Sequence, residues 1–150
     1  MEKSLILSVS AGTGCYRHIQ ISESATLLKL SSAILNSVNF YDDHLHSFFM
    51  NNRAWDQDAE YACPGGDLEE DGVRGSSDKV KLSKFRLVKG DKFLYIFDYG
   101  DEWRFQIKVL QVIEGTTISP IVLKSVGKII QYEDYEGDWD EDEDDEDETD

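Results

Sequence analysis

The strongest constraint on the fold of this chain is a regular alternation of large apolar side chains between residues 92 and 112. The alternate positions are occupied by Phe93, Tyr95, Phe97 and Tyr99, and then by Trp103, Phe105, Ile107 and Val109. A period of two residues is typical of β-strands, because successive side chains point to opposite faces. Since turn-forming residues around Gly100 separate the two stripes, the pattern predicts a β-hairpin with one apolar face.

The number of residues in the hairpin loop decides whether both stripes share a face. An odd loop such as Gly100–Glu102 pairs Tyr99 with Trp103 and keeps all the large side chains together, whereas an even loop separates them. We therefore expect the odd register, which also sets Asp98 opposite Arg104. We expect Trp103 to be buried, so that Trp103→Ala lowers the stability by about 3–5 kcal/mol.

Shorter periodic segments predict further strands and one helix. We expect strands over residues 3–9, 15–21 and 44–50. Apolar residues recur at three-and-four spacing after Ser24, which predicts an amphipathic helix over 25–38 with Ser24 as its N-cap and Asn39 at its end. Residues 51–78 have no periodicity and predict a long loop.

Together these elements predict an α+β fold. We expect a single domain over residues 1–137, in which a largely antiparallel sheet is covered by one main helix. A chain of 150 residues buries enough apolar surface to fold without a metal or a disulfide. Cys15 and Cys63 are expected to be free thiols, since two distant cysteines make no disulfide framework.

The negative charge of the chain is concentrated at its C-terminus. The formal net charge is −16, and residues 138–150 contribute 11 carboxylates and no base, whereas residues 1–137 carry 20 acids against 15 bases. Such a run repels itself and predicts a disordered, solubilising acidic tail over 138–150. A tail that captures a basic protein partner is the alternative.

The sequence also narrows the class of partner. A nucleic-acid-binding surface concentrates Lys and Arg on one face, but the most basic stretch, from Lys79 to Lys92, is interleaved with apolar residues. Direct binding of nucleic acid is therefore disfavoured. No apolar run approaches the about 18 residues of a membrane helix, and the N-terminus lacks a signal-peptide pattern. We expect a cytoplasmic protein.

Two small groups of polar residues are candidates for chemistry. His44 and His46 lie two positions apart, so both rings point to one side of a strand, as in many metal sites. Asp98 and Asp101 flank the predicted turn, and the four side chains form a candidate ligand set for a divalent metal. The alternatives stay open: histidines that hydrogen-bond to backbone or water, and aspartates that accept turn amides.

Several segments together resemble one protein family. They are CYRHIQI (15–21), the helix that follows it, HLHSFF (44–49), FDYGDEWRFQIKV (97–109) and YEDYEG (132–137). These segments are similar to the plasmid pRiA4b ORF-3-like family, also described as a transposon passenger protein family. The resemblance implies a single α+β domain and an association with plasmids and mobile elements, and it implies no particular activity.

The chain departs from this family pattern at two places. Phe105 occupies a position at which the family often has a histidine, which removes a potential metal ligand. Residues 131–134 read Gln-Tyr-Glu-Asp, whereas the family pattern is Pro-Pro-Glu-Asp. The acids Glu133 and Asp134 are kept, but the loss of both prolines makes this acidic segment less rigid.

Two functions from different classes fit these observations. The first is a non-enzymatic binding or interaction module for a protein partner, with a groove that contains Trp103, Glu133 and Asp134 and lies between the histidine strand and the Asp98 turn. The second is a divalent-metal-dependent hydrolase for a phosphate-containing substrate, with His44, His46, Asp98 and Asp101 as metal ligands. Whether the protein is an enzyme depends on whether these imidazoles and carboxylates converge.

Overall fold

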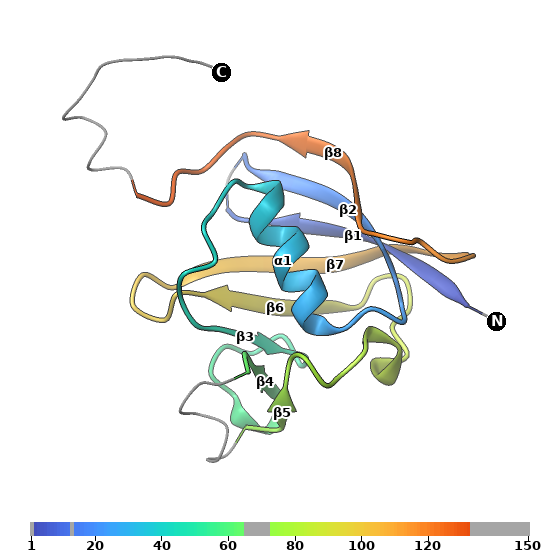
Figure 1. Cartoon of the computed structure of the whole chain (residues 1–150), viewed down its shortest axis with the longest axis horizontal. Helices are drawn as coiled ribbons and strands as arrows, with labels where there is room; N and C mark the ends of the chain where they lie inside the picture. The colour runs from blue at the N-terminus through green and yellow to red at the C-terminus, as the bar shows by residue number, and fades with distance from the viewer. Residues whose placement is uncertain (1, 13, 65–72, 133–150) are drawn as a thin grey trace.

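The structure, a computed structural model, describes residues 2–12, 14–64 and 73–132. It contains one eight-stranded sheet with a single α-helix lying against one face (Figure 1). The elements are β1 (Lys3–Ser10), β2 (Tyr16–Ser22), α1 (Leu27–Ser37), β3 (His46–Phe49), η1 (Gln57–Ala59), β4 (Glu60–Ala62), β5 (Gly75–Ser76), η3 (Leu82–Phe85), β6 (Lys92–Phe97), β7 (Trp103–Glu114) and β8 (Ile121–Val126). The predicted α+β single domain is confirmed.

The strand order is β5-β4-β3-β6-β7-β1-β2-β8. All neighbours pair antiparallel except β4 and β5, which pair parallel. The sheet is therefore largely antiparallel, as predicted. The predicted boundary at residue 137 and the predicted disorder of the acidic tail over 138–150 lie outside the described residues.

The hairpin of β6 and β7 has the predicted odd register, but its loop is longer. Phe97 pairs with Trp103, so Asp98–Glu102 form a loop of five residues. Tyr99 leaves the strand, and its hydroxyl donates a hydrogen bond of 2.9 Å to the carbonyl of His46. Asp98 adopts a left-handed φ of 67°, which aspartate tolerates better than most residues and which ends the strand there.

The predicted pairing of Asp98 with Arg104 is wrong, because the longer loop moves Asp98 out of the ladder. Arg104 faces Ile96 instead. Its guanidinium forms an ion pair with Glu102, the last residue of the loop before β7, and Nε lies 2.8 Å from a carboxylate oxygen. The charge on Arg104 is thus satisfied locally, and Asp98 is available for contacts within the turn.

Helix α1 begins two residues later than predicted. Thr26, and not Ser24, is the N-cap: its side chain accepts a hydrogen bond of 3.1 Å from the amide of Lys29. The amide of Leu27 donates to the carbonyl of Val80, which ties this helix end to another segment. Asn39, with φ of 62°, ends the helix as predicted. Within the described ranges, no helix has the length and apolar character needed to cross a membrane.

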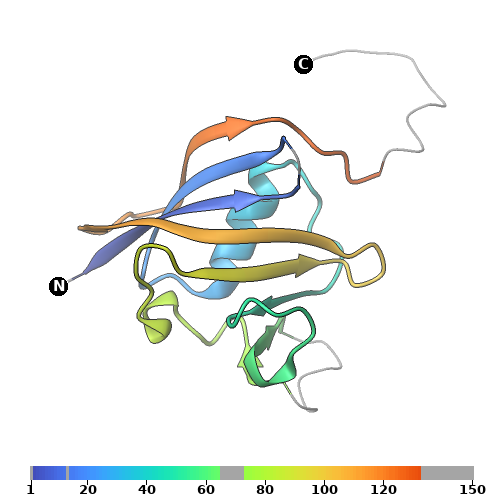
Figure 2. The ribbon, with the colours of Figure 1, turned by 180° about the vertical axis from the view of Figure 1, so that it is seen from behind.

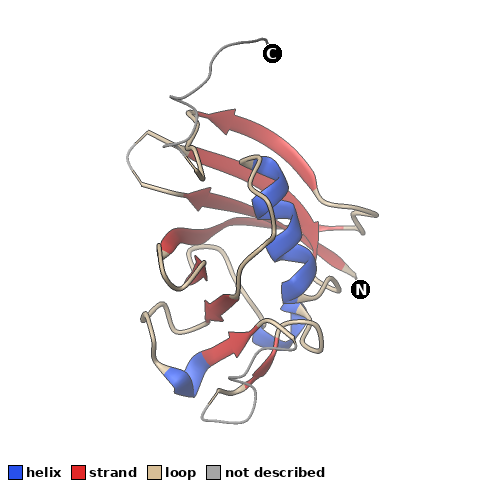
Figure 3. Cartoon of the chain, turned by 60° about the vertical axis from the view of Figure 1, so that its left-hand side comes forward, coloured by secondary structure: helices blue, strands red, loops and turns tan. Residues whose placement is uncertain are grey.

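Helix α1 lies against one face of the sheet (Figure 3). The apolar side chains of the hairpin are buried beneath it and belong to the hydrophobic core. Leu27, Leu30 and Ile34 of the helix are fully buried against the sheet. Below them Tyr95 packs on Phe48 and Phe105, with ring centroids 4.7 and 5.6 Å apart. The packed core therefore follows from the alternation of aromatic residues in the sequence.

The sequence did not predict three of the strands, β4, β5 and β8. β4 and β5 lie in the segment predicted as a loop over 51–78 and have only three and two residues, too few for a periodic signal. β8 pairs with β2 at the edge of the sheet, and five of its six residues are exposed. An exposed edge strand carries no alternation of buried and solvent-facing positions, so nothing in its sequence marks it.

His46 belongs to the core. Its Nε2 lies 2.9 Å from the hydroxyl of Ser77, and its Nδ1 lies 3.5 Å from that of Ser31, which in turn contacts the hydroxyl of Tyr95 at 2.6 Å. His46 is 2% exposed. Burial disfavours the charged ring and lowers the pKa of His46 to about 4. This network joins α1, β3 and β6 through neutral groups.

We predict that Phe105→Ala destabilises the protein more than Trp103→Ala. Phe105 is 1% exposed, so its truncation costs about 3–5 kcal/mol. Trp103, the first residue of β7, packs against Phe40 but is only half-buried. The loss of stability predicted from the sequence for Trp103→Ala is therefore too high. Urea denaturation of both variants measures the two losses, and a larger loss for Trp103→Ala would contradict this packing.

We predict that His46 makes the stability depend on pH. An unfolded histidine takes up a proton near its ordinary pKa of 6.5, whereas the folded ring stays neutral down to about 4. The unfolded state therefore binds more protons in this window, and the free energy of unfolding falls by up to about 3 kcal/mol as the pH drops through it. Relative to wild type, His46→Gln flattens this part of the pH profile. His18→Gln, a change of a half-exposed histidine, leaves it intact.

Candidate functional site

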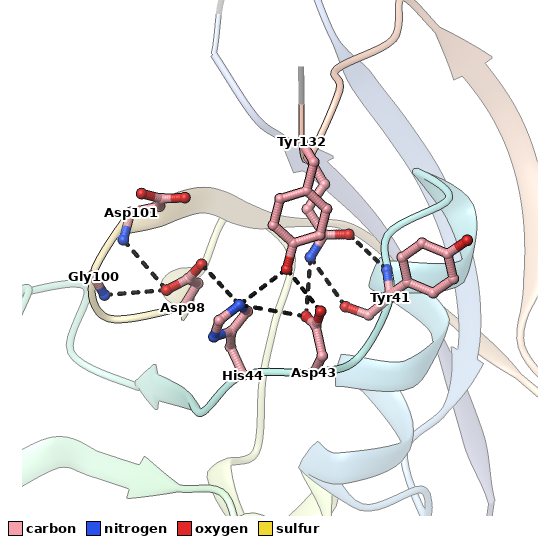
Figure 4. Close-up of polar contacts among 8 residues, drawn as sticks. Tyr41, Asp43, His44, Asp98, Gly100, Asp101 and Tyr132 are labelled. Carbon is pink, nitrogen blue, oxygen red and sulfur yellow. Dashed lines mark hydrogen bonds and ion pairs between the residues drawn. The ribbon is translucent and has the colours of Figure 1, made fainter. Parts of the chain in front are cut away.

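Three segments that are distant in the sequence meet at one corner of the molecule (Figure 4). They are the loop before β3, the turn between β6 and β7, and the segment after β8. We call this site the polar corner and define it by Tyr41, Asp43, His44, Asp98, Gln131 and Tyr132. Two of these segments, the one with His44 and the one with Asp98, also border the predicted groove, whereas its third part, Glu133 and Asp134, lies outside the described residues.

His44 is the centre of the polar corner. Its Nε2 lies 3.0 Å from the hydroxyl of Tyr132, 3.5 Å from Oδ2 of Asp98 and 3.6 Å from Oδ1 of Asp43. The Tyr132 hydroxyl donates its proton to Asp43 at 2.7 Å. All neighbours of Nε2 are then acceptors, so we assign the ring hydrogen to Nε2, and this nitrogen presents no free lone pair.

Asp98 connects the hairpin turn to His44. One carboxylate oxygen accepts the amides of Gly100 and Asp101, at 3.2 and 3.3 Å, and the other faces the His44 ring. The Asp98 side chain is 10% exposed, whereas that of His44 is 39% exposed. Asp98 therefore accepts hydrogen bonds from the turn amides, which is the alternative role that the sequence suggested for it. Its second oxygen also orients the ring of His44.

Gln131 and Tyr132 hold the last described segment against the loop before β3. The Gln131 amide accepts from the backbone of Tyr41 at 2.7 Å and donates back to it at 3.1 Å. It also donates to Asp43 at 3.2 Å. The side chain of Gln131 thus satisfies both backbone groups of Tyr41, and the two segments are pinned together.

A pocket of about 560 Å³ borders the polar corner and shares three of its residues. It is lined by Arg17, Val38, Asn39, Tyr41, Lys128, Ile129, Ile130, Gln131 and Tyr132. Its floor includes Arg17, which is buried and whose guanidinium donates to the carbonyls of Ser37, Tyr16 and Val126. Tyr41 and Ile130 stand at the rim, 73% and 55% exposed.

The four candidate metal ligands are only partly brought together. His44 and Asp98 meet in the polar corner, but His46 lies in the core between the hydroxyls of Ser31 and Ser77. Asp101 joins the site through its backbone amide, and the residue is exposed. Among residues 2–12, 14–64 and 73–132, no group of three or more His, Cys, Asp or Glu side chains is arranged to hold a metal ion.

The residues predicted for the binding groove have different positions. Trp103 stands beside the corner, edge-on to Phe40 with ring centroids 5.0 Å apart. Its indole Nε1 is buried without a hydrogen-bond partner among the described residues. Glu133 and Asp134 directly follow Tyr132 but lie outside the described residues. The part of the predicted groove formed by Glu133 and Asp134 therefore lies outside the described residues, and the groove stays a prediction.

A second buried polar cluster lies on the opposite face of the sheet. Ser47 donates to Glu60 at 2.6 Å, and its oxygen lies 2.6 Å from the hydroxyl of Tyr99. Burial raises the pKa of Tyr99 to about 12. Ser47 thus points away from His46, as the strand pattern predicts, and has no imidazole to act as its base.

The two cysteines are free thiols, as predicted. Cys15 is buried, and Cys63 is half-buried. Burial is the main cause that raises the pKa of the Cys63 thiol, so the thiolate is disfavoured. Cys63 is therefore not an activated nucleophile.

Sequence reasoning missed Tyr41, Gln131 and Tyr132. One signal was available: the chain contains Tyr-Asp-Asp at 41–43 and Tyr-Glu-Asp at 132–134, two copies of a tyrosine followed by two acids. In the structure the two copies are in contact, because the hydroxyl of Tyr132 in the second donates a hydrogen bond to Asp43 in the first (Figure 4). The contact through Gln131 has no comparable signal, because it depends on where the chain returns after β8.

Comparison with solved structures supports the fold. The chain is similar to the crystal structure of a protein of unknown function, MM3350, from Methanosarcina mazei Go1. The sequences are 28% identical, and the TM-score is 0.67. The alignment covers 83% of this chain and 70% of that chain. No curated protein matches this chain.

The comparison with family models agrees with the resemblance noted in the sequence. The model described as plasmid pRiA4b ORF-3-like protein matches residues 9–148. This range contains α1, the hairpin of β6 and β7 and every residue of the polar corner. Since the match spans nearly the whole chain, the protein belongs to the plasmid pRiA4b ORF-3-like family.

Proposed function

We propose that this protein is a non-enzymatic binding module that recognises a protein partner through the polar corner and the adjoining pocket. The observation that carries the proposal is the convergence of three chain segments on an open, polar rim beside a pocket of about 560 Å³. Binding sites are usually concave and carry a few well-placed polar groups. The family resemblance supports an association with mobile elements, and we propose a cytoplasmic location.

The charges of the corner favour a partner segment with Lys or Arg side chains. Asp42, Asp43 and Asp101 are exposed around His44, and Glu133 and Asp134 follow in the sequence. Arg104, the nearest cation on the hairpin, is already paired with Glu102. Complementary charge steers association and selects among partners.

The rim of the pocket adds an apolar component. The ring of Tyr41 is 73% exposed, although its backbone is fixed by Gln131. Ile130 is 55% exposed on the facing segment. Aromatic side chains on a fixed backbone lose little entropy on binding and often carry much of the interface energy. We therefore expect a partner segment that combines basic and apolar residues.

The alternative is a divalent-metal-dependent hydrolase acting on a phosphate-containing substrate. Its support is the approach of His44 to two carboxylates within 3.6 Å. A metal would have to replace the hydrogen on Nε2 of His44, and His46 would have to leave Ser31 and Ser77. The binding module requires no such rearrangement, and for this reason we prefer it.

We predict that calorimetric titration of the full chain with Zn²⁺ or Mn²⁺ gives the same isotherm for wild type and His44→Ala. The carboxylates of the acidic segment are common to both proteins, so their weak binding cancels in the comparison. A stoichiometric site that disappears in both His44→Ala and His46→Ala would contradict the prediction and favour the hydrolase.

We predict that the full chain selects basic, apolar peptides from a random displayed library, and that their binding depends on Tyr41 and Asp43, which Tyr41→Ala/Asp43→Asn tests. The recovered peptides should bind the double variant about tenfold or more weakly than wild type, measured by fluorescence anisotropy, because central interface residues carry most of the affinity. Tyr16→Ala, on the other face of the sheet, is the control and should keep the wild-type affinity. Peptides that bind wild type and the double variant equally would refute the proposed site.

A further inference from the structure

The face of the sheet opposite α1 is open over β7, β1 and β2. Viewed from behind, these strands lie in front of the helix, and no described helix crosses them (Figure 2). Half-exposed or exposed side chains alternate along them with the buried ones that face α1. On the neighbouring strand β6 the same face is covered by a second apolar cluster of Phe49, Leu94 and Ile96, but Lys92 at the start of β6 is exposed.

A row of cationic side chains crosses this face. Cross-strand partners join Lys92 to Lys108, Lys108 to Ser8, Ser8 to His18 and His18 to Lys124. Partners in a ladder share a face, and the adjacent pair of Phe93 and Ile107 is buried under α1, so the row lies on the open side. Five neighbouring strands spaced about 4.8 Å apart make this row about 19 Å wide.

The positive charge of the row is not balanced nearby. Two positions away, the same face carries uncharged residues on all five strands: Leu94, Gln106, Ile6, Ser10, Tyr16, Gln20 and Val126. Among the described residues, none of the three lysines forms an ion pair, and Lys124 instead lies 5.8 Å from the centre of the Tyr16 ring. Like charges held in register repel one another, so the row favours an anionic occupant.

The chain itself contains a segment of matching charge. Residues 138–150 carry 11 carboxylates and no base, and they follow the last described residue, Tyr132, after five more residues. An extended chain covers about 3.3 Å per residue, so residues 133–150 span up to about 60 Å, roughly three times the width of the row. A covalent tether of this length also holds the segment at a local concentration in the millimolar range.

We propose that the row formed by Lys92, Lys108, Ser8, His18 and Lys124, whose positive charge comes from its three lysines, binds the acidic C-terminal segment, residues 138–150, of the same chain. The contacts are exposed ion pairs, each weak alone, and their number and tethering make the association effective at low salt. Any other polyanion must displace this segment to reach the open face. The row is separate from the polar corner, so this inference stands or falls independently of the proposed function.

The test is zero-length carbodiimide cross-linking of the full chain, followed by mass spectrometry of the monomer. The reagent joins a carboxylate to a lysine amine only when the two are in contact. At low salt we expect links from residues 138–150 to Lys92, Lys108 and Lys124, about fivefold or more above links to Lys29, an exposed lysine on α1, and a loss of this preference near 0.5 M salt.

Matched variants separate the row from a general attraction to lysines. Lys108→Gln/Lys124→Gln weakens the row and should reduce the remaining links to Lys92 by about half or more, since neighbouring charges act together. Lys29→Gln removes the same kind of charge on the helix side and should leave them unchanged. Both variants replace exposed side chains, so the fold is retained.

Four outcomes would overturn the proposal. The first is equal linking of residues 138–150 to Lys29 and to the row. The second is a preference for Lys81, Lys84 or Lys89. The third is linking between chains in a mixture of isotopically light and heavy protein, which would assign the row to a second copy. The fourth is no link to the row at low salt.

Discussion

The burial of the hairpin's large side chains beneath α1 is the constraint on which the remaining structure depends. Phe97 must face Trp103 for both apolar stripes to share the core side, and this pairing leaves five residues to close the loop. The loop then begins at Asp98 in a left-handed conformation, which turns its carboxylate toward the amides of the turn and toward His44. The position of the polar corner is therefore a consequence of core packing, although none of its polar atoms belongs to the core.

The parts of the fold that the sequence predicts are those in which a periodic pattern is tied to burial. The parity of the hairpin and the position of α1 follow because a shift by one residue would expose Phe105 or Leu30. The length of the hairpin loop does not follow, since loops of three and five residues preserve the same faces. β8 could not be predicted either, because a strand that is exposed along most of its length shows no alternation of apolar and polar residues. The chain segments that form the site were predictable from the sequence. That His44 lies in the polar corner while His46 lies in the core was not predictable, because the position of His46 depends on its contacts with Ser31 and Ser77.

The sheet divides the charges of the molecule between two regions. The turn of β6 and β7 collects carboxylates around His44, whereas the open face gathers lysines of β6, β7 and β8 into one row. In the sequence Lys92, Lys108 and Lys124 are 16 residues apart each time and stand among apolar neighbours, so they do not form a basic stretch. Only the pairing of β6, β7, β1, β2 and β8 brings them into line. A surface charge pattern of this kind is a property of topology and register, which composition and local sequence cannot reveal.

Gln131 and Tyr132 stand where the family resemblance implies two prolines, and these side chains hold the polar corner in another way. A proline restricts the backbone by itself, whereas glutamine and tyrosine leave it free and must order it through side-chain contacts. Here the Gln131 amide bridges the backbone of Tyr41, and the Tyr132 hydroxyl reaches Asp43 and His44. Each of these hydrogen bonds is exposed to water. Because water can take the place of either partner, each bond contributes only about 0.5–1.5 kcal/mol to the stability. The segment after β8 is thus fixed by several weak contacts and not by a restricted backbone, and binding of the proposed partner would require only that these contacts be replaced one at a time.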